Sequence, residues 1–470
     1  MPAFVMNQQI CRHDFPAGML LLDFLRTEQQ LASTKQACRE GDCGACLVLV
    51  GQLQNGLMYY RAVNSCLLPL GLLAGQHIVT IEGVNKGSDL NFVQQTLVEQ
   101  GAIQCGFCTP GLVMAITAFL LHAPEFTADL AIDAVSGNLC RCTGYAGIQR
   151  AIQQICQPLD LSLSKPATRI QDLITQNVLP AYFADIPQQL VSLPEQNTTF
   201  NLNVSPNTIK VAGGTDLFVQ QPAQLISQPL GFIEQADSIQ VEQQRCIISA
   251  STHTETLRTS IVLQGMFPSI IDDFKLICSS AIRQQATLAG NLVNASPIGD
   301  LSVFFLALDA ELMLCSATAQ RNIALRHFFQ DYKQVDLHEG ELIKQLSFAC
   351  PEQTSLLSFE KVSKRQHLDI ASVNSAMSLV VADKVIRQAH IAVGGVAAIP
   401  LYLAKTSAFL QDKEISIGLF EQALKLAQAE ITPLSDVRGS AAYKRLLVQQ
   451  LFITHWLKLL PDYVTWQDFQ

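Results

Sequence analysis

The pattern of apolar and polar positions changes along the chain and predicts both strands and helices. Residues 47–60, LVLVGQLQNGLMYY, predict two short strands joined by a turn at Gln-Asn-Gly. Apolar residues recur at helical spacing in residues 19–31, 91–100, 113–121 and 146–155. The N-terminal third therefore combines a strand pair with several short helices, which indicates an α+β protein.

Length and composition place the chain among globular proteins. Its 470 residues suggest three or four domains, and 49% of them are hydrophobic. The net charge of -9 argues against a nucleic acid or an anionic membrane as partner. The longest apolar run, residues 111–121, is shorter than the roughly 18 residues that span a bilayer. The N-terminus lacks the pattern of a signal peptide, so we expect a cytoplasmic protein.

The 14 cysteines are distributed unevenly. In a reducing cytoplasm cysteines are seldom paired as disulfides, so metal ligands, reactive thiols or core residues are expected. Eight of them lie between residues 38 and 142. The others are expected to be small core residues, namely Cys11, Cys156, Cys246, Cys278, Cys315 and Cys350. The N-terminal third is therefore predicted to be rich in metal.

The first set of cysteines has the spacing C-x4-C-x2-C followed by a distant fourth residue, which is typical of plant-type [2Fe–2S] clusters. Its members are Cys38, Cys43, Cys46 and Cys66. Gly41 and Gly44 permit the tight bend that three converging thiolates require. Amides of such a loop can donate hydrogen bonds to sulfur. A structural zinc site, which also takes four cysteines, is the alternative.

The second set combines C-x2-C with C-x-C. Its members are Cys105, Cys108, Cys140 and Cys142. Each pair lies near the start of a predicted helix, and helix N-termini stabilise an anionic cluster. We expect four short helices with the cluster between their ends. Zinc is again the alternative.

Together the two sets resemble the paired [2Fe–2S] domains of the molybdenum hydroxylases, a family that includes xanthine dehydrogenase, aldehyde oxidase and carbon monoxide dehydrogenase. The resemblance lies in residues 38–46, 64–66, 104–111 and 137–145. It implies a β-grasp plant-type ferredoxin domain at residues 1–83 and a four-helix [2Fe–2S] domain at residues 84–157. Residues 158–187, rich in Pro, Gln and Ser, are expected to be a linker with some local helix.

Two further segments contain glycines and small polar residues. Residues 208–220, TIKVAGGTDLFVQ, predict a strand followed by glycines that let amides approach a phosphate, although alone they could form an ordinary turn. Residues 286–301, ATLAGNLVNASPIGDL, add a loop of small and polar residues. In this order the segments resemble the FAD domain of the same family. The resemblance implies an α+β domain of the vanillyl-alcohol-oxidase type at residues 188–353 and a C-terminal, FAD-associated α+β module at 354–470.

The resemblance also implies a set of FAD-binding residues. Residues 210–217 and 287–291 would wrap the pyrophosphate, and Asp300 would bind the adenosine end. Ile277 and Ile343 would pack near the flavin ring, although the family often has an aromatic residue in place of Ile277, and Ala289 replaces a usual glycine. Lys361 would lie at the flavin edge, the alternative being a solvated basic turn. The residues are Lys210, Val211, Ala212, Gly213, Gly214, Thr215, Asp216 and Leu217; Ile277; Ala286, Thr287, Leu288, Ala289, Gly290 and Asn291; and Asn294, Asp300, Ile343 and Lys361.

The function that the resemblance implies is electron transfer in a molybdenum hydroxylase of the xanthine dehydrogenase type, which converts hypoxanthine to xanthine and urate. Electrons would pass from molybdopterin on a large partner subunit through the second cysteine set, the first set and FAD to NAD+. Two copies of each chain would form a heterotetramer. The alternatives are an aldehyde or N-heterocycle hydroxylase and a non-enzymatic iron–sulfur or zinc module. No dinucleotide fingerprint is present, so NAD+ and O2 both stay open as acceptors. His253, His327 and His367 have no ligand-like spacing.

Overall fold

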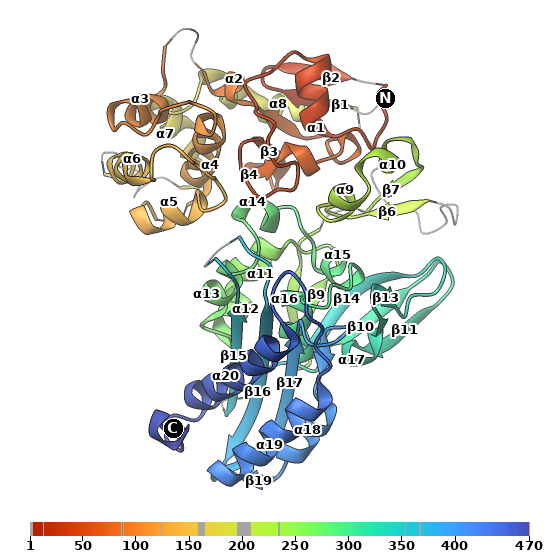
Figure 1. Cartoon of the computed structure of the whole chain (residues 1–470). Coiled ribbons are helices and arrows are strands. Elements are labelled where there is room, and N and C mark those ends of the chain that lie inside the picture. The colour runs from red at the N-terminus through yellow and green to blue at the C-terminus, as the bar shows by residue number, and fades with distance from the viewer. Residues whose placement is uncertain are drawn as a thin grey trace. The chain divides into compact units, whose positions relative to one another are not determined.

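The structure is a computed structural model (Figure 1). It describes residues 3–12, 14–85, 87, 89–123, 125–157, 165–194, 208–233, 236–352, 354–365 and 368–469. These residues form two compact units. The first comprises the described residues up to 194 together with 208–233 and 279–286. The second comprises residues 236–278 and the described residues from 287 onward.

A five-stranded sheet of order β2-β1-β5-β3-β4 begins the first unit. Its strands are β1 (Ala3–Met6), β2 (Gln9–Arg12), β3 (Leu47–Gln54), β4 (Leu57–Asn64) and β5 (His77–Val79). Strands β1 and β5 are parallel and the other neighbours antiparallel. β3 and β4 are the predicted strand pair, and their turn contains Gly56 at φ +80°. The β-grasp prediction is confirmed.

The helix expected over residues 19–31 is shorter and wider than predicted. It consists of α1 (Leu21–Asp23), which continues as one π-helical segment, η1 (Phe24–Glu28). Leu21, Phe24 and Leu25 are fully buried against the sheet, and Gln30 at φ +56° ends the segment. The apolar spacing therefore identified the buried face correctly, while the backbone changes direction before residue 31.

The four predicted helices follow the short α2 (Ile81–Val84). They are α3 (Phe92–Glu99), α4 (Thr109–His122), α5 (Ala128–Ala134) and α6 (Ala146–Cys156). Helix α4 is buried along almost its whole length because α3, α5 and strands β3 and β4 pack around it. The continuous apolar run of residues 111–121 is thus explained by its central position in the core of the first unit.

The segment predicted as a linker is packed rather than extended in its described part, and the rest of it, residues 158–164, lies outside the described residues. It forms α7 (Arg169–Thr175) and η4 (Ala181–Asp185), and α8 (Ile186–Val191) follows. Leu173, Leu179 and Phe183 are fully buried in the core around α4. The Arg169 guanidinium donates to the carbonyls of Leu120 and Ala123, each at 3.1 Å, at the end of α4. The linker prediction was therefore wrong for residues 165–187, because their apolar side chains complete this core.

Residues 208–233 form a small β-α-α-β element within the first unit. It consists of β6 (Ile209–Val211), α9 (Leu217–Gln220), α10 (Pro222–Ser227) and β7 (Leu230–Phe232), with β6 and β7 parallel. Val211 and Phe218 are buried together with Cys66 and Leu67. The short α14 (Ser280–Arg283) belongs to the same unit. Residues 208–233 and 279–286, which fall in the range 188–353 predicted for the FAD domain, thus belong to the first unit.

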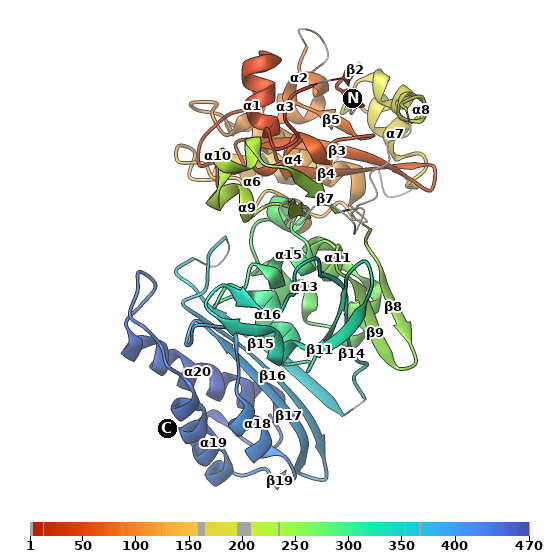
Figure 2. The same cartoon turned by 90° about the vertical axis from the view of Figure 1, so that its right-hand side faces the viewer.

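The second unit begins with a five-stranded sheet of order β11-β10-β14-β9-β8 (Figure 2). Its strands are β8 (Ile239–Glu242), β9 (Arg245–Ser249), β10 (Glu311–Cys315), β11 (Gln320–Ala324) and β14 (Leu342–Ala349). Six helices of the described residues accompany it, namely α11 (Thr254–Thr259), α12 (Ile261–Met266), α13 (Ile270–Lys275), α15 (Leu288–Val293), α16 (Asp300–Leu306) and α17 (Leu325–Phe328). Phe267, Phe274, Phe304 and Phe348 contact one another edge-on or tilted in its core.

A second sheet of order β15-β16-β17-β18 carries the C-terminal part, with β19 (Lys413–Glu414) paired to β17. Its strands are β15 (Ser355–Val362), β16 (Val373–Ala382), β17 (Val385–Gly394) and β18 (Leu401–Tyr402). The helices α18 (Ala404–Leu410), α19 (Ile417–Glu430) and α20 (Ala441–Leu459) lie along it (Figure 1). Trp456 of α20 is fully buried against Phe420 of α19. This part is α+β, as predicted.

The cysteines outside the two sets are mostly core residues, as expected. Cys246 and Cys315 are buried, and Cys11, Cys156 and Cys350 are half-buried. Cys278 differs because it is exposed and lies at φ +50° in the turn before α14. The prediction that it fills a core was wrong. Across the described part of the chain, no helix combines the length and the apolar character that a membrane crossing requires.

Candidate redox site

The first cysteine set lies in two segments. Cys38, Cys43 and Cys46 are in the loop between η1 and β3, and Cys66 is in the turn that follows β4. The Sγ atoms of Cys38 and Cys43 are 3.2 Å apart. Cys46 and Cys66 are both buried and hydrogen-bond through their thiols. The bond from Cys43 lowers the pKa of Cys38 to about 5, and the bond from Cys66 lowers the pKa of Cys46. Each pair therefore favours one thiolate, the form that binds iron.

Two glycines shape this loop as predicted. Gly41 has φ +79° and Gly44 has φ +67°. A Cβ atom on Gly44 would lie 2.7 Å from the carbonyl oxygen of Gly137. The Glu40 amide lies 3.4 Å from Cys38 Sγ and donates to it, which is the predicted N–H···S contact.

The second set comes from two helix ends, as predicted. Cys108 immediately precedes α4, while Cys140 and Cys142 lie in the loop between α5 and α6. Cys142 Sγ is 3.5 Å from Cys105 Sγ, and Cys108 hydrogen-bonds with Cys140. Burial opposes ionisation of Cys140, but hydrogen bonds that it accepts from Thr143 and nearby amides lower its pKa to about 7. Cys105 and Cys142 are exposed, so this set reaches the surface of the first unit.

Both sets have thiols arranged as two pairs. A [2Fe–2S] cluster takes four cysteine sulfurs, two for each iron, so paired thiols fit its two metal positions. The donor atoms and their pairing therefore fit two-iron clusters, which Cys38, Cys43, Cys46 and Cys66 and, separately, Cys105, Cys108, Cys140 and Cys142 would hold.

The two cysteine loops contact each other directly. The Leu139 amide donates to the carbonyl oxygen of Cys43 at 3.0 Å. The buried Asn138 donates from Nδ2 to the Gly44 carbonyl at 3.1 Å. Gly111 in α4 packs against the same carbonyl, since a Cβ there would lie 2.0 Å from it. Cys43 of one set is thus one hydrogen bond and one peptide unit away from Cys140 of the other.

The Gly-Gly-Thr-Asp segment follows β6 after one residue, Ala212, so a strand precedes it as predicted. Gly214 has φ +71°, and a Cβ on Gly213 would lie 2.0 Å from the Gln285 carbonyl. The buried Gln285 side chain donates from Nε2 to the carbonyls of Gly213 and Leu67, each at 2.8 Å. Leu67 follows Cys66 in the chain. Gln285 therefore joins the glycine loop to the segment that carries a cysteine of the first set.

The second glycine-containing segment, residues 287–294, belongs to the second unit. Thr287 caps α15 by accepting from the Gly290 amide at 3.2 Å, and the Ala289 amide donates to the Ala250 carbonyl at 2.9 Å. The side-chain oxygen of Asn291 is buried without a hydrogen-bond partner among the described residues. Asn294 accepts from Lys333 through its carbonyl oxygen, at 2.8 Å, and through its side-chain oxygen. Asn291 thus keeps an acceptor for a ligand, whereas Asn294 already has a partner.

Lys361 and Asp300 form a buried ion pair. Lys361 Nζ lies 2.7 Å from Asp300 Oδ2 and 2.8 Å from the Leu276 carbonyl, and its side chain is 2% exposed. Asn374 donates to the other oxygen of Asp300 at 2.6 Å. The alternative of a solvated basic turn is therefore wrong for Lys361. Because FAD is an extended molecule, the two residues cannot contact its opposite ends, and the assignment of Asp300 to the adenosine end is inconsistent with an edge position for Lys361.

Other predicted site residues have ordinary surroundings. Ile277 and Ile343 are both buried in the core of the second unit. His253 is also buried and lies 2.9 Å from Asp237 as a satisfied histidine, whereas His367 is outside the described residues. Sequence patterns did not reveal Gln285 or Asn374, since neither stands in a motif and their roles depend on contacts across the fold.

Four family models match the chain in consecutive order. A 2Fe-2S iron-sulfur cluster binding domain matches residues 5–69, and a [2Fe-2S] binding domain matches residues 80–153. An FAD binding domain in molybdopterin dehydrogenase matches residues 184–349, and a CO dehydrogenase flavoprotein C-terminal domain matches residues 358–459. By domain architecture the chain belongs to the molybdenum hydroxylase family. The chain accordingly contains both kinds of [2Fe–2S] binding domain and an FAD-binding domain.

Curated members of this family are similar over nearly the whole chain. Xanthine dehydrogenase/oxidase of Rattus norvegicus is 25% identical over 97% of this chain and 39% of its own length. Xanthine dehydrogenase 1 of Arabidopsis thaliana is 26% identical over 94% of this chain and 38% of its own length. Aldehyde oxidase 1 of Rattus norvegicus is 25% identical over 97% of this chain and 39% of its own length. The chain thus spans about two fifths of these molybdenum hydroxylases.

Solved structures of the family share the fold of part of the chain. Carbon monoxide dehydrogenase from Hydrogenophaga pseudoflava, in a form lacking the Mo-pyranopterin moiety of its cofactor, has a chain that aligns with a TM-score of 0.52 and 22% identity. The alignment covers 55% of this chain and 92% of that one. Reconstituted CO dehydrogenase from Oligotropha carboxidovorans aligns with a TM-score of 0.50 and 24% identity, over 53% and 88% of the two chains.

Proposed function

We propose that this chain carries electrons within a molybdenum hydroxylase of the xanthine dehydrogenase type, from a molybdenum centre on a large partner subunit to NAD+. The observation that carries the proposal is the contact between the two cysteine loops, where the Leu139 amide donates to Cys43. When bound, the two clusters would carry single electrons and FAD would collect two of them for release as a hydride. The protein contributes ligands, spacing and electrostatic surroundings.

The exposure of the two cysteine sets supports an order of transfer. Cys105 and Cys142 are exposed, so the second set is accessible to a donor outside this chain. Cys46 and Cys66 are buried, and Gln285 connects the Cys66 segment to the glycine loop. Electrons are therefore expected to enter at the second set and leave through the first set toward FAD.

The FAD site is proposed to include two groups of residues. Residues 210–217 would approach the pyrophosphate through backbone amides, in a loop that packs at Gly213 against the Gln285 carbonyl and at Gly214 against the Phe218 ring. Thr287, Gly290 and Asn291 would contribute from the other segment, with the unpartnered Asn291 oxygen as an acceptor. Asp300 and Lys361, being paired, would contact the same part of the flavin. Ile277 and Ile343 would contribute apolar contacts nearby.

The partner is proposed to be a large subunit that binds molybdopterin, in a heterotetramer of two copies of each chain. The substrate would be set by that subunit, with hypoxanthine and xanthine as the first choice. An aldehyde or N-heterocycle hydroxylase is the second candidate, because rat aldehyde oxidase 1 has the same identity to this chain as rat xanthine dehydrogenase/oxidase. Cytoplasmic location is part of the same proposal.

Purification of the chain with its co-expressed partner tests this function. We expect iron–sulfur and flavin absorption, about four irons per chain from the two [2Fe–2S] clusters, molybdenum in the partner, and xanthine-dependent reduction of NAD+. A colourless zinc protein would contradict the redox proposal. A flavin-free protein that fails to oxidise NADH with a dye acceptor would contradict the route through FAD. Activity with an aldehyde but not with xanthine would favour the second candidate.

A further inference from the structure

Three hydrogen bonds close a ring around Cys140 in the loop between α5 and α6. The Cys140 amide donates to Tyr145 Oη at 3.0 Å. The Tyr145 amide donates to Thr143 Oγ1 at 3.2 Å. Thr143 Oγ1 lies 3.1 Å from Cys140 Sγ. Tyr145 can take this position because it adopts a left-handed conformation, φ +66°, at the start of α6.

The direction of the Thr143–Cys140 bond follows from the chemistry of its ends. A cysteine that ligates iron is a thiolate and has no proton to donate. The Thr143 hydroxyl accepts from the Tyr145 amide, and its single proton is then directed to Cys140 Sγ. Cys140 is 7% exposed and Thr143 is half-buried, so water competes weakly for this bond.

We propose that Thr143 is a positioning residue that raises the reduction potential of the cluster held by Cys105, Cys108, Cys140 and Cys142. Reduction adds one electron to the cluster and no atom, so the cluster becomes more negative by one charge. An O–H···S bond stabilises the more negative state more strongly and thereby favours reduction. This inference rests on the proposed function, in which this set receives electrons first; a higher potential makes it a better acceptor.

The first cysteine set has a different arrangement. Its nearest side-chain amide, Asn64, lies with Oδ1 3.6 Å from Cys46 Sγ, while Asn64 Nδ2 is directed to the Gly41 carbonyl at 3.4 Å. The hydroxyl near that set belongs to Ser65, which donates to the Cys46 carbonyl at 2.7 Å and also lowers the pKa of the Cys46 thiol, whereas the Thr143 hydroxyl contacts Cys140 of the other set. The effect of Thr143 is therefore confined to the second set, and the first set is an internal control.

The test is a potentiometric titration of the holoprotein followed by EPR, in which each reduced cluster gives its own signal. In Thr143→Val, which keeps the side-chain shape and removes the hydroxyl, we expect the equilibrium constant for reduction of the second cluster to fall about tenfold. For a one-electron couple this corresponds to about 59 mV. Thr143→Ser keeps the hydroxyl and should restore most of the potential. The potential of the first cluster should stay unchanged in both variants.

Thr117→Val is the matched control, because Thr117 is a buried threonine of the same domain whose hydroxyl donates to the Val113 carbonyl at 2.7 Å. An unchanged potential of the second cluster in Thr143→Val, or an equal shift in Thr117→Val, would overturn the inference. If Thr143→Val does not retain the second cluster, the reduction potential of that cluster in Thr143→Ala is compared with its potential in Thr143→Ser and in wild type. Wild-type protein without two [2Fe–2S] signals would instead refute the proposed function, so the two failures are distinguishable.

Discussion

At the scale of single residues, buried polar side chains join segments of the site by donating hydrogen bonds to backbone carbonyls. Gln285 illustrates this, because both protons of its amide are used between Leu67 and Gly213. It is 3% exposed, so no water replaces a lost bond. A buried carbonyl that loses its donor costs about 1–3 kcal/mol.

We therefore expect Gln285→Ala to lower the free energy of unfolding by about 2 kcal/mol and to reduce the flavin retained on purification. Urea unfolding and the ratio of flavin to protein absorbance measure the two effects. Gln284→Ala is the control, since Arg61 contacts the Gln284 backbone carbonyl, at 2.8 Å, which alanine keeps. Equal behaviour of the two variants would contradict a bridging role for Gln285.

Residue patterns predicted which cysteines the fold brings together better than they predicted the contacts around them. The spacing of the eight cysteines was enough for this, because thiols that are to share a cluster must lie close together whatever the rest of the fold does. Gln285, Asn374 and Thr143 act on residues that other segments bring near, and no local spacing indicates that. Asp300 and Lys361 were named separately from the sequence, and their pairing at 2.7 Å changes what either can do for FAD.

At the scale of elements, the glycines of the first cysteine loop let it contact the second. Gly44 combines φ +67° with close contact, since a Cβ would lie 2.6 Å from Asn138 Nδ2 and 2.7 Å from the Gly137 carbonyl. Gly75 has a similar φ of +70° and open space around its Cβ position. Alanine substitutions at these two positions therefore distinguish the effect of backbone strain from the effect of steric contact.

Gly44→Ala should lose iron from both sets, because the alanine methyl forces the loops apart, whereas Gly75→Ala should keep both clusters at a cost of about 1 kcal/mol from its positive φ. Iron content and the EPR signals of the reduced protein measure this. If Gly75→Ala loses as much iron as Gly44→Ala, strain alone explains the loss and the loop contact is not required.

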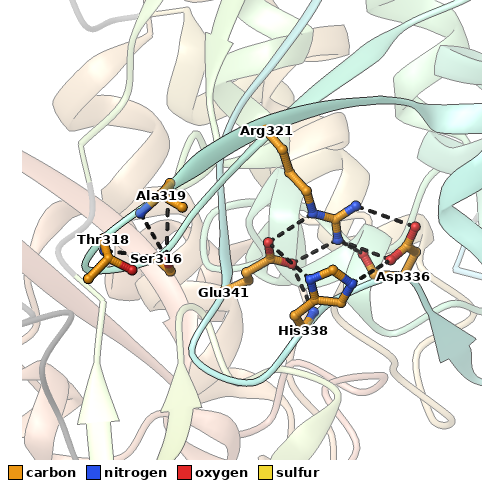
Figure 3. A network of polar contacts seen from close by, with 7 residues as sticks. All are labelled: Ser316, Thr318, Ala319, Arg321, Asp336, His338 and Glu341. Atoms are coloured by element: carbon orange, nitrogen blue, oxygen red, sulfur yellow. Dashed lines mark hydrogen bonds and ion pairs between the residues drawn. The ribbon is translucent and has the colours of Figure 1, made fainter.

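A second connection between elements is the charged network of the second unit. Arg321 of β11 contacts Asp336 at 3.0 Å and Glu341 at 2.8 Å, and His338 lies between the two carboxylates (Figure 3). Ser316 accepts from the amides of Thr318 and Ala319 in the turn that leads into β11. Glu341 immediately precedes β14, which carries Ile343. The network therefore fixes the start of a strand whose Ile343 is proposed to contribute to the FAD site.

This network should make stability depend on pH in acid. The hydrogen bond from Arg321 lowers the pKa of Glu341 from 4.5 to about 2. The stabilisation that the ionised Glu341 gives the folded state is therefore complete above pH 4.5 and is lost as the pH falls toward 2. The free energy of unfolding of the wild type should exceed that of Arg321→Met by about 1–2 kcal/mol at pH 7, and this difference should shrink at pH 3. Urea unfolding at the two pH values measures it, and a difference independent of pH would contradict the ionic origin.

The predicted elements were correct where a pattern has one structural explanation. The strand pair at residues 47–60 and the four helices of the second cluster domain are present. The expected linker was wrong because Leu173, Leu179 and Phe183 have no strong periodicity, yet all three are buried around α4. Polar composition is thus a poor guide when a few apolar residues complete a core that other segments build.

At the scale of the whole molecule, the residues proposed to bind cofactors are divided between two units. The first contains both cysteine sets and the Gly-Gly-Thr-Asp loop, while the second contains Asn291, Asp300 and Lys361. The first set of cysteines is connected to the second set through Leu139 and to the glycine loop through Gln285. Electrons that travel between FAD and the second set should therefore pass through the first.

Removal of one cluster at a time tests this order. In Cys108→Ser, which lacks a ligand of the second set, NADH should still reduce the first cluster rapidly. In Cys46→Ser, which lacks a ligand of the first set, NADH should bleach the flavin but reduce the second cluster at least tenfold more slowly than in wild type, because the intermediate carrier is gone. Freeze-quench EPR measures both rates, and dithionite, which reduces each cluster directly, shows that the remaining cluster is intact. Rapid reduction of the second cluster in Cys46→Ser would place FAD next to that set and reverse the proposed order.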